Sequence, residues 1–372
     1  MALPSTPTLP PLYDRWISEL LGMRLTGEPA ATCSDCAMCT AGATGRADSP
    51  RVDDPVSFDP DARCCTYQPE IWNFLAGAAL ADRSREGARA RESILTRIAT
   101  ADRVTPLGLG RSRKYATLYA AGGDGFGRSH ALRCPHYVVE GSQCAIWRHR
   151  DSTCATWFCK HEHGAVSKRF WDRLRELLAG IEHAIARHAV LALDVGEPAL
   201  AALFPIAARS EPSLSAGDLD DVGDPAGMRK LWGRWAGREV DFYIDAAGVA
   251  DALSWEEVRR LGGADLALRV TLLVDAQREL GSRGLPQRMR APGFSVATGI
   301  AHAPGNVVIG TYSGYDPLEV PEILLRCLPY FDGRPTGDAL DAIEAALGVR
   351  LERGLVRRLH EFGVLAEVRD PA

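Results

Sequence analysis

The 372-residue sequence lacks the features that would assign it directly to a membrane, a secretory route or nucleic acid. No apolar run approaches the ~20 residues that a helix needs to span a bilayer, so no membrane segment is expected. The first residues have neither the basic stretch nor the continuous apolar stretch of a secretory signal, and we therefore expect a cytoplasmic protein. A formal net charge of −5 argues against general binding of nucleic acid by the chain as a whole.

Common catalytic and nucleotide-binding motifs are also missing. The chain has no H-E-x-x-H motif, no G-x-S-x-G nucleophile elbow, no G-x4-G-K-[ST] phosphate loop and no C-x3-C-x2-C radical run. The glycines of residues 107–111 and 122–128 do not follow a strand and open a helix, as a nucleotide loop requires, so they are predicted to be turns leading into Cys134. The sequence therefore identifies no catalytic base or nucleophile.

Cysteine, by contrast, is concentrated in the first half of the chain. Of the ten cysteines, nine lie between Cys33 and Cys159. Cys327 lies outside, in an apolar helical segment, and is predicted to be an inert core residue. A chain of this length can bury a sufficient core without disulfides, and no export signal points to an oxidising compartment. Inert burial explains the close spacing of the nine poorly, so metal ligation is the favoured interpretation.

The nine candidate ligands form three groups. The first, Cys33-Ser-Asp-Cys36-Ala-Met-Cys39, is a C-x2-C-x2-C run whose tight turns can bring successive thiolates to one metal or cluster. The fourth local cysteine of a ferredoxin motif is missing, so a distant ligand has to complete the site. The remaining candidates are the adjacent pair Cys64 and Cys65, and a third group of Cys134, Cys144, Cys154 and Cys159. Four histidines lie among them and could complete a site, although each is expected to be a polar neighbour instead: His136, His149, His161 and His163.

The third group resembles the YkgJ-type cysteine-cluster family. The resemblance is carried by Cys134-Pro135 and by the stretch Cys144-Ala-Ile-Trp-Arg-His-Arg-Asp-Ser-Thr-Cys154, and the early C-x2-C-x2-C run is similar to the family's N-terminal signature. That family is a zinc- or iron-chelating domain, so the resemblance implies chelation by the cysteines of residues 33–163. Trp147 stands where the family has tyrosine, Asp151 where it has proline, and the cysteine doublet occurs at residues 64–65. Which thiols share a metal is therefore open.

Zinc and iron–sulfur clusters both accept four thiolates, so ligand type alone does not identify the metal. The C-x9-C-x9-C-x4-C spacing from Cys134 suits loops around a bulky cluster, and neighbouring aromatic residues could form an apolar shell around it. These features favour an iron–sulfur cluster, of the [4Fe–4S] type, that serves a redox or a protein- or peptide-modification reaction. The alternative is a non-enzymatic adaptor in which zinc is structural.

The rest of the chain predicts a mainly α fold with short β elements, an α+β class. We expect a cysteine-rich metal-binding domain over residues 1–165, a mainly helical region over 166–300 and a small module over 301–372. Apolar positions at helical spacing predict a helix from Lys168 to Leu193. A second helix is predicted from residue 70 to 99, with a charged middle that is either a solvated face or a helix–helix turn. Further helices are predicted near residues 254–260 and 264–280, where Ser254 and Glu257 fit a capping box.

The final module has the order helix, short turn, helix, strand, which is typical of winged-helix domains. A strand is predicted at residues 306–312, Pro321 is expected to open a helix, and Thr336 is expected to cap the helix that ends at Gly348. The order is also similar to PqqD-like domains that hold leader peptides, which implies a peptide or protein partner. DNA recognition expects a more basic helix, since Glu352 and Glu361 offset the arginines around residues 350–358. A purely structural cap is the remaining alternative.

Overall fold

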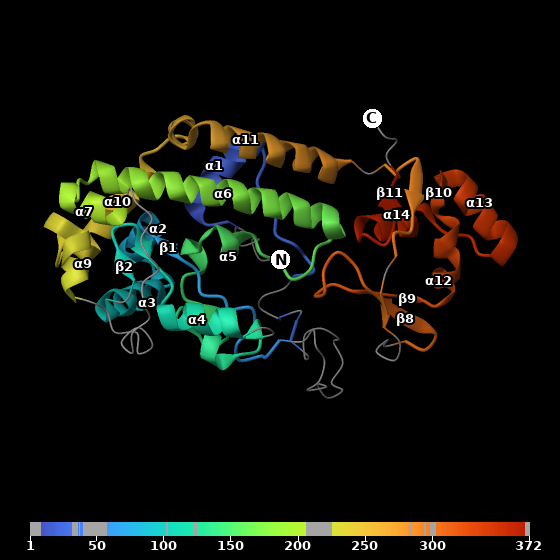
Figure 1. Ribbon diagram of the computed structural model, residues 1–372, viewed down its shortest axis with the longest axis horizontal. Coiled ribbons are helices and arrows are strands. Elements are labelled where there is room, and N and C mark those ends of the chain that lie inside the picture. The colour runs from blue at the N-terminus through green and yellow to red at the C-terminus, as the bar shows by residue number, and fades with distance from the viewer. Residues whose placement is uncertain are drawn as a thin grey trace. The chain divides into compact units, whose positions relative to one another are not determined.

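The computed structural model describes residues 9–31, 36, 38–39, 58–101, 103–122, 125–205, 225–282, 284–293, 295–297 and 303–368 (Figure 1). These residues are mainly helical with small antiparallel sheets, which confirms the α+β expectation. Among the residues that the structure describes, no helix is both long enough and apolar enough to cross a bilayer.

The chain forms two compact units. The first unit comprises Met1–Gly27, Ser34–Trp157 and Leu174–Thr271, and the second comprises Glu28–Cys33, Phe158–Arg173 and Leu272–Ala372. The predicted three domains, with boundaries after residues 165 and 300, divide the chain differently, and that division stays a prediction.

The first unit is built from short helices and two small sheets, β1-β3-β2 and β4-β5. Its helices are α1 (Pro11–Leu21), α2 (Asn73–Ala81), α3 (Gly87–Thr100), α4 (Arg113–Ala121), α5 (Ser152–Thr156), α7 (Glu197–Leu203), α9 (Pro225–Trp232) and α10 (Glu239–Asp251). Its strands are β1 (Ile71–Trp72), β2 (Val104–Thr105), β3 (Gly108–Leu109), β4 (Tyr137–Val138) and β5 (Gln143–Cys144). Two long helices, α6 (Gly164–Ala192) and α11 (Trp255–Gly281), contribute residues to both units.

The core of the first unit depends on a close approach of α2 to α10. A Cβ atom at Gly77 would lie 1.7 Å from the Tyr243 carbonyl oxygen, so only glycine fits there. Asn73 ties the start of α2 to its neighbours, because its side-chain amide donates to the carbonyls of Pro106 and Ala186, each at 2.9 Å. Both contacts satisfy buried polar groups and fix the position of α2.

The helix predicted from residue 70 to 99 is two helices, α2 and α3, so the interpretation of its charged middle as a helix–helix turn is confirmed. Asp82 leaves the helical conformation, with φ −66° and ψ 104°. Its carboxylate accepts a hydrogen bond from the Ser84 amide at 2.9 Å, and the Ser84 hydroxyl accepts from the Gly87 amide at 3.0 Å. Side-chain acceptors of this kind favour turns and helix starts over a helix interior.

The helix predicted from Lys168 to Leu193 is α6. Its six predicted apolar positions are all buried: Phe170, Leu174, Leu177, Leu178, Ile181 and Ile185. The two later predicted helices form one element, α11, interrupted at Gly263, where φ is +58°. The capping box before it is confirmed, since Ser254 Oγ accepts from the Glu257 amide at 3.3 Å and Glu257 Oε2 accepts from the Ser254 amide at 2.8 Å.

The turn predicted for the glycines of residues 107–111 is wrong at Gly108. Gly108 is not part of a turn but lies in β3, the middle strand of the antiparallel sheet β1-β3-β2. Its φ is +141°, and a Cβ atom would lie 2.2 Å from the Ile71 carbonyl oxygen. Glycine is therefore needed for close strand approach, which a sequence pattern does not distinguish from a turn.

The second unit contains two antiparallel sheets and three short helices in addition to its parts of α6 and α11. Its strands are β6 (Arg288–Arg290), β7 (Val296–Ala297), β8 (Asn306–Ile309), β9 (Leu318–Pro321), β10 (Asp332–Pro335) and β11 (Ala366–Glu367), in the orders β10-β6-β11 and β7-β8-β9. Its helices are α12 (Ile323–Cys327), α13 (Thr336–Leu347) and α14 (Arg353–Glu361). The predicted order helix, helix, strand is present as α13, α14 and β11.

Some local details of this unit differ from the prediction. Pro321 ends β9, and α12 begins only at Ile323. Thr336 is the first residue of α13 and does not cap it, because its hydroxyl donates to the Pro286 carbonyl at 2.8 Å. The predicted end of α13 is confirmed, since Gly348 has a left-handed φ of +65°. Cys327 is fully buried in the core, as predicted.

Candidate metal centre

The structure separates the predicted ligands. Seven belong to the first unit: Cys36, Cys39, Cys64, Cys65, Cys134, Cys144 and Cys154. Cys159 belongs to the second unit, and Cys33 lies outside the described residues. None of the described cysteines forms a disulfide.

Cys36 and Cys39 form one pair. The Cys39 amide donates to the Cys36 carbonyl at 2.9 Å, which closes a turn, and Cys39 pairs with Phe58 in an isolated β-bridge. The two thiols are in hydrogen-bonding contact, and this contact lowers the pKa of Cys36 to about 6 and raises that of Cys39. Cys36 is therefore the thiol of the pair that ionises first. The nearby positive charge of Arg63 also favours its thiolate.

Cys64 and Cys65 form a second pair in the turn that follows Arg63. Contact with the Cys65 thiol, together with burial, raises the pKa of Cys64. Electrostatic interactions connect Cys64 with both Cys36 and Cys39. These four residues, Cys36, Cys39, Cys64 and Cys65, are called the first thiol group below.

A second thiol group consists of Cys134, Cys144 and Cys154. Cys144 lies on β5, where it pairs with Tyr137 of β4, and Cys154 lies in α5. Burial raises the pKa of all three thiols, that of Cys144 to about 11. Charge interactions connect Cys154 with both of the others. The three residues therefore form one electrostatically coupled set.

The two thiol groups are neighbours. The Cys134 amide donates to the Cys65 carbonyl at 2.7 Å, and the charges of Cys64 and Cys144 interact. The Thr66 hydroxyl, directly after the cysteine pair, accepts from the Gly127 amide at 2.6 Å. Residues far apart in sequence are thus held together by main-chain contacts around the thiols.

Arginines lie near both groups, Arg63 at the first and Arg97 and Arg150 at the second, where the negative charge of Asp151 opposes them. The guanidinium of Arg150 lies 3.5 Å from the centre of the Trp147 ring and donates to the carbonyl oxygens of Trp147 and Cys154 at 2.9 and 3.1 Å. Its charge favours the thiolate of Cys144, as that of Arg97 does for Cys134. Arginines of this kind can offset the negative charge of several thiolates on one metal.

Behind the second thiol group lies a buried carboxylate that sequence reasoning missed. Glu182 of α6 accepts hydrogen bonds from Tyr13 Oη at 2.5 Å and from the amide and hydroxyl of Ser152, each at 2.6 Å. Burial raises its pKa to about 8 and that of Asp151 to about 6. The sequence could have indicated its burial, because Glu182 lies four residues after Leu178 and therefore on the apolar face of the helix.

Asp151 connects this carboxylate to the thiols. It precedes α5 and accepts a hydrogen bond from the Cys154 amide at 2.9 Å, so it caps the short helix that carries Cys154. A proline at this position could not supply this cap, because it has no side-chain acceptor. Asp151 therefore positions Cys154.

Each of the candidate histidines has an oxygen partner. His136 Nδ1 lies 2.8 Å from Ser93 Oγ, and burial lowers the pKa of its ring to about 3. The others lie near Asp82, Tyr312 and Glu361, in the pairs His149–Asp82 (3.3 Å), His161–Tyr312 (3.2 Å) and His163–Glu361 (3.5 Å). His136 and His149 belong to the first unit and His161 and His163 to the second.

The described side chains do not form a complete coordination site. Among the residues that the structure describes, no three His, Cys, Asp or Glu side chains are arranged to hold a metal ion. The chemistry of the donors nevertheless fits a thiophilic metal, because uncrosslinked thiols from separate segments adjoin one another beside arginines. Closing either group around a metal requires side-chain movement.

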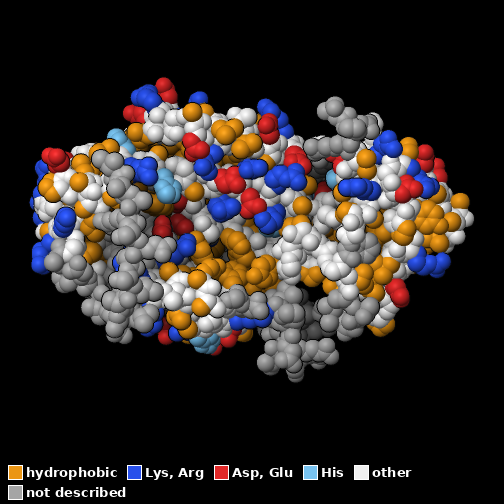
Figure 2. Space-filling view, in the orientation of Figure 1, with side chains coloured by type: hydrophobic (Ala, Val, Ile, Leu, Met, Phe, Trp, Pro, Cys, Tyr) orange, Lys and Arg blue, Asp and Glu red, His pale blue; other side chains and the backbone are white. Residues whose placement is uncertain are grey.

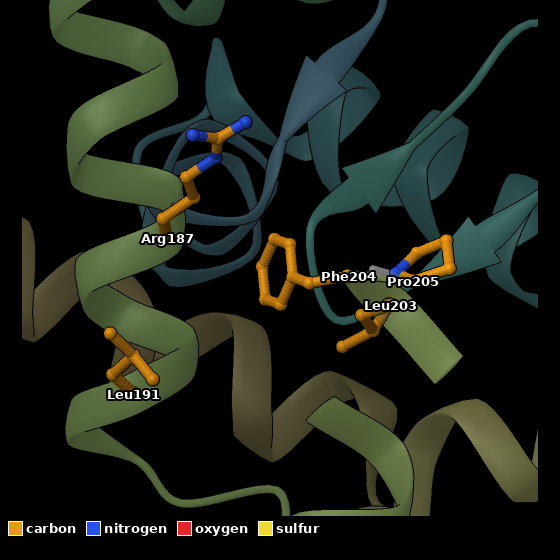
Figure 3. A pocket seen from close by; sticks show the side chains of 5 residues that line it. All are labelled: Arg187, Leu191, Leu203, Phe204 and Pro205. Carbon is orange, nitrogen blue, oxygen red and sulfur yellow. The ribbon is translucent and has the colours of Figure 1, made fainter. Parts of the chain in front are cut away.

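A groove in the first unit offers chemistry of a different kind. A groove of about 590 Å³ is lined by Arg187, Leu191, Leu203, Phe204 and Pro205 and contains no thiol or carboxylate among these residues (Figure 3). On the face shown in Figure 2, basic and acidic side chains alternate along α6 and do not form one basic patch. That distribution provides no continuous track for a nucleic-acid backbone on this face.

Comparison with known proteins found no counterpart. No protein-family model, no curated protein and no solved structure matches the chain. The resemblance to the YkgJ-type family consequently stays a prediction from the cysteine pattern, and the function has to be argued from the residues themselves.

Proposed function

We propose that the chain is a metalloprotein whose first unit binds an iron–sulfur cluster through cysteine thiolates. The observation that carries the proposal is the adjacency of the two thiol groups, which come from separate stretches of the chain and are not cross-linked. Inert core cysteines have no reason to gather in this way, whereas metal ligands must.

The first thiol group offers the four thiolates that a [4Fe–4S] cluster requires, and the second offers three. Cys33 and Cys159 remain predicted ligands from the sequence pattern. A bound cluster would supply one-electron redox chemistry. The protein's own contribution would be the arginine charge near the thiolates and the apolar cover from residues such as Trp157, which stacks on Phe58 with ring centres 6.5 Å apart.

The second unit suggests what the cluster would serve. The sequence β10–α13–α14–β11 has the element order of a winged-helix or PqqD-like module. We propose that this module binds a peptide or protein substrate and that the first unit provides the redox centre for its modification.

Purification without air provides the test. The wild-type protein is expected to be brown, to absorb near ~400 nm and to contain iron and sulfide in stoichiometric amounts. Cys64→Ser and Cys144→Ser are expected to lose iron, whereas Cys327→Ala is the matched control, because it removes a buried thiol from the core of the second unit. Equal iron content in all four proteins would refute ligation by the two thiol groups.

A zinc-binding adaptor is the second candidate. The specific observation in its favour is that the first thiol group consists of two contacting pairs, Cys36–Cys39 and Cys64–Cys65, and two pairs are the usual composition of a structural zinc site. A colourless protein with one or two equivalents of zinc, released by the same serine variants, would support this function over a redox one.

A further inference from the structure

Helix α4, at one edge of the first unit in Figure 1, exposes apolar side chains that the proposed cluster does not use. Every residue from Ala116 to Ala121 is exposed, and these residues include Leu118 at 38% and Tyr119 at 39%. Within α4, Tyr115 is the one buried residue. A surface helix normally buries an apolar stripe, so apolar side chains gathered on an exposed helix are typical of an interaction surface.

The surface at α4 is basic, in contrast to the chain as a whole. Residues 103–122 contain four Lys or Arg residues and no Asp or Glu, whereas the chain has a formal net charge of −5. Three of the four lie at the start of the helix: Arg111, Arg113 and Lys114, of which Lys114 is exposed. Lys114 and Leu118 are four residues apart and therefore share one face of the helix. An apolar centre beside a charged rim is typical of protein–protein interfaces, and the positive charge favours an acidic partner.

Direct contacts connect α4 to the segment that follows Cys65. Tyr115 Oη donates to the Thr66 carbonyl at 2.9 Å. The ring of the exposed Tyr119 contacts that of Tyr67, with ring centres 6.3 Å apart. Thr66 and Tyr67 directly follow Cys65, a member of the first thiol group. A short path through these contacts therefore joins the α4 surface to the thiols.

We propose that the exposed face of α4 is the docking surface for an acidic one-electron carrier protein that reduces the proposed cluster. This inference rests on the proposed function, since a redox centre needs a source of electrons. The carrier gives one electron to the oxidised cluster and is itself oxidised by one electron, and no bond or proton changes place. Electron-transfer complexes have small interfaces, so a short helix with a basic rim is of suitable size. Nucleic-acid interfaces are more polar and more strongly basic, and the apolar centre of this surface favours a protein.

The test measures binding and electron transfer separately in the full-length protein purified without air. The probe is an acidic plant-type [2Fe–2S] ferredoxin. Calorimetry at low ionic strength is expected to detect a complex, and Lys114→Glu should weaken it by about 10-fold, because like charges then face each other. Glutamate is favourable in the first turn of a helix, so this charge reversal preserves α4. Leu118→Gln should weaken the complex without changing its dependence on salt.

Lys230→Glu is the matched control, because it makes the same charge reversal at an exposed lysine of α9, another helix of the first unit. It should leave the affinity for ferredoxin unchanged. Rapid-freeze electron paramagnetic resonance then follows reduction of the cluster by ferredoxin, which Lys114→Glu should slow by about 10-fold at low ionic strength. High salt should abolish the difference between this variant and the wild type. Dithionite needs no docking and should reduce the cluster equally fast in both proteins.

Each other result has a distinct meaning. Failure of ferredoxin to bind at low ionic strength, or equal affinity in the wild type and Lys114→Glu, would overturn the docking surface. Absence of any centre that dithionite reduces would refute the proposed function itself, and the binding measurement distinguishes that result from failure of the surface. Binding to phosphatidylserine vesicles or DNA that Lys114→Glu abolishes, without binding of ferredoxin, would assign α4 to those partners and overturn the proposal.

Discussion

Replacing Glu182 by glutamine tests the buried carboxylate behind the second thiol group. Glu182 is 2% exposed and lies among α1, α5 and α6. Burial, reinforced by the negative charge of Asp151, raises its pKa to about 8, so the folded protein holds it neutral at pH 7.

Glutamine can reproduce the contacts of the neutral acid. Its amide oxygen can accept from Tyr13 Oη and the Ser152 amide, as Oε1 of Glu182 does. Its NH₂ group can donate to the Ser152 hydroxyl oxygen, in place of the proton that Oε2 carries in the neutral acid. Glu182→Gln therefore removes the ionisation and leaves no buried polar group without a partner.

The size of the effect on stability follows from the linkage between proton binding and folding. Raising the pKa of Glu182 from 4.5 in the unfolded chain to about 8 in the folded protein corresponds to at most about 5 kcal/mol, at about 1.4 kcal/mol for each pH unit. Because the folded state binds the proton more tightly, this stabilisation is complete below pH 4.5 and is lost as the pH rises to about 8. The ionisations of Asp151 and Glu182 are coupled, so the loss of stability with rising pH belongs to the pair and not to Glu182 alone.

Urea unfolding followed by circular dichroism between pH 5 and pH 8 measures the effect. The Gln variant is expected to match the wild type near pH 5 and to become more stable than it by several kcal/mol towards pH 8. Glu182→Leu is the control, since it strands the Tyr13 hydroxyl and the Ser152 amide and should cost about 1–3 kcal/mol for each at every pH. Parallel pH curves for the wild type and the Gln variant would refute the reasoning.

Three further predictions concern packing, reactivity and the metal. Gly77→Ala would place a methyl group against the Tyr243 carbonyl and should lower the free energy of unfolding in urea by more than about 2 kcal/mol. Gly248→Ala, in the α10 helix with no atom within 4 Å of the added carbon, should instead be neutral or stabilising by up to about 1 kcal/mol. In metal-free protein at pH 7, iodoacetamide should label Cys36 fastest, as peptide mass spectrometry would detect, because its pKa is lowered to about 6. Cys39→Ala should remove that preference. Stripping the metal with a chelator should make the first unit more sensitive to limited proteolysis, and unchanged cleavage would contradict a structural role for the metal.

Local sequence pattern predicted the elements whose determinants are local. The apolar spacing of residues 168–193 produced α6, and the Ser254–Glu257 capping box formed as expected. Errors occurred where contacts distant in sequence decide the outcome. In the sequence Gly108 resembles a turn glycine, because the close approach of the Ile71 carbonyl is visible only in the fold.

For the candidate site, too, the sequence indicated the local pattern but not the contacts between distant segments. Cysteine spacing predicted metal ligands, because few other functions require that spacing, and ligation by these thiols stays a prediction. It did not reveal that the Cys134 amide donates to the Cys65 carbonyl, or that Tyr13 contacts Glu182 across 169 residues of sequence. Those contacts depend on how segments distant in sequence pack together, α1 with α6 in the second case, and no short motif records this.

The protonation of the thiols determines how metal binding in the first unit would depend on pH. Burial raises the pKa of Cys134, Cys144 and Cys154, so these thiols are largely protonated at neutral pH despite the positive charge of Arg97 and Arg150. Thiolates, and not thiols, are metal ligands. The arginines alone are therefore too weak to ionise the group, and a divalent or higher cation is the charge that would. Under the proposed function, metal binding and loss of these protons are one event, which makes metal affinity increase with pH.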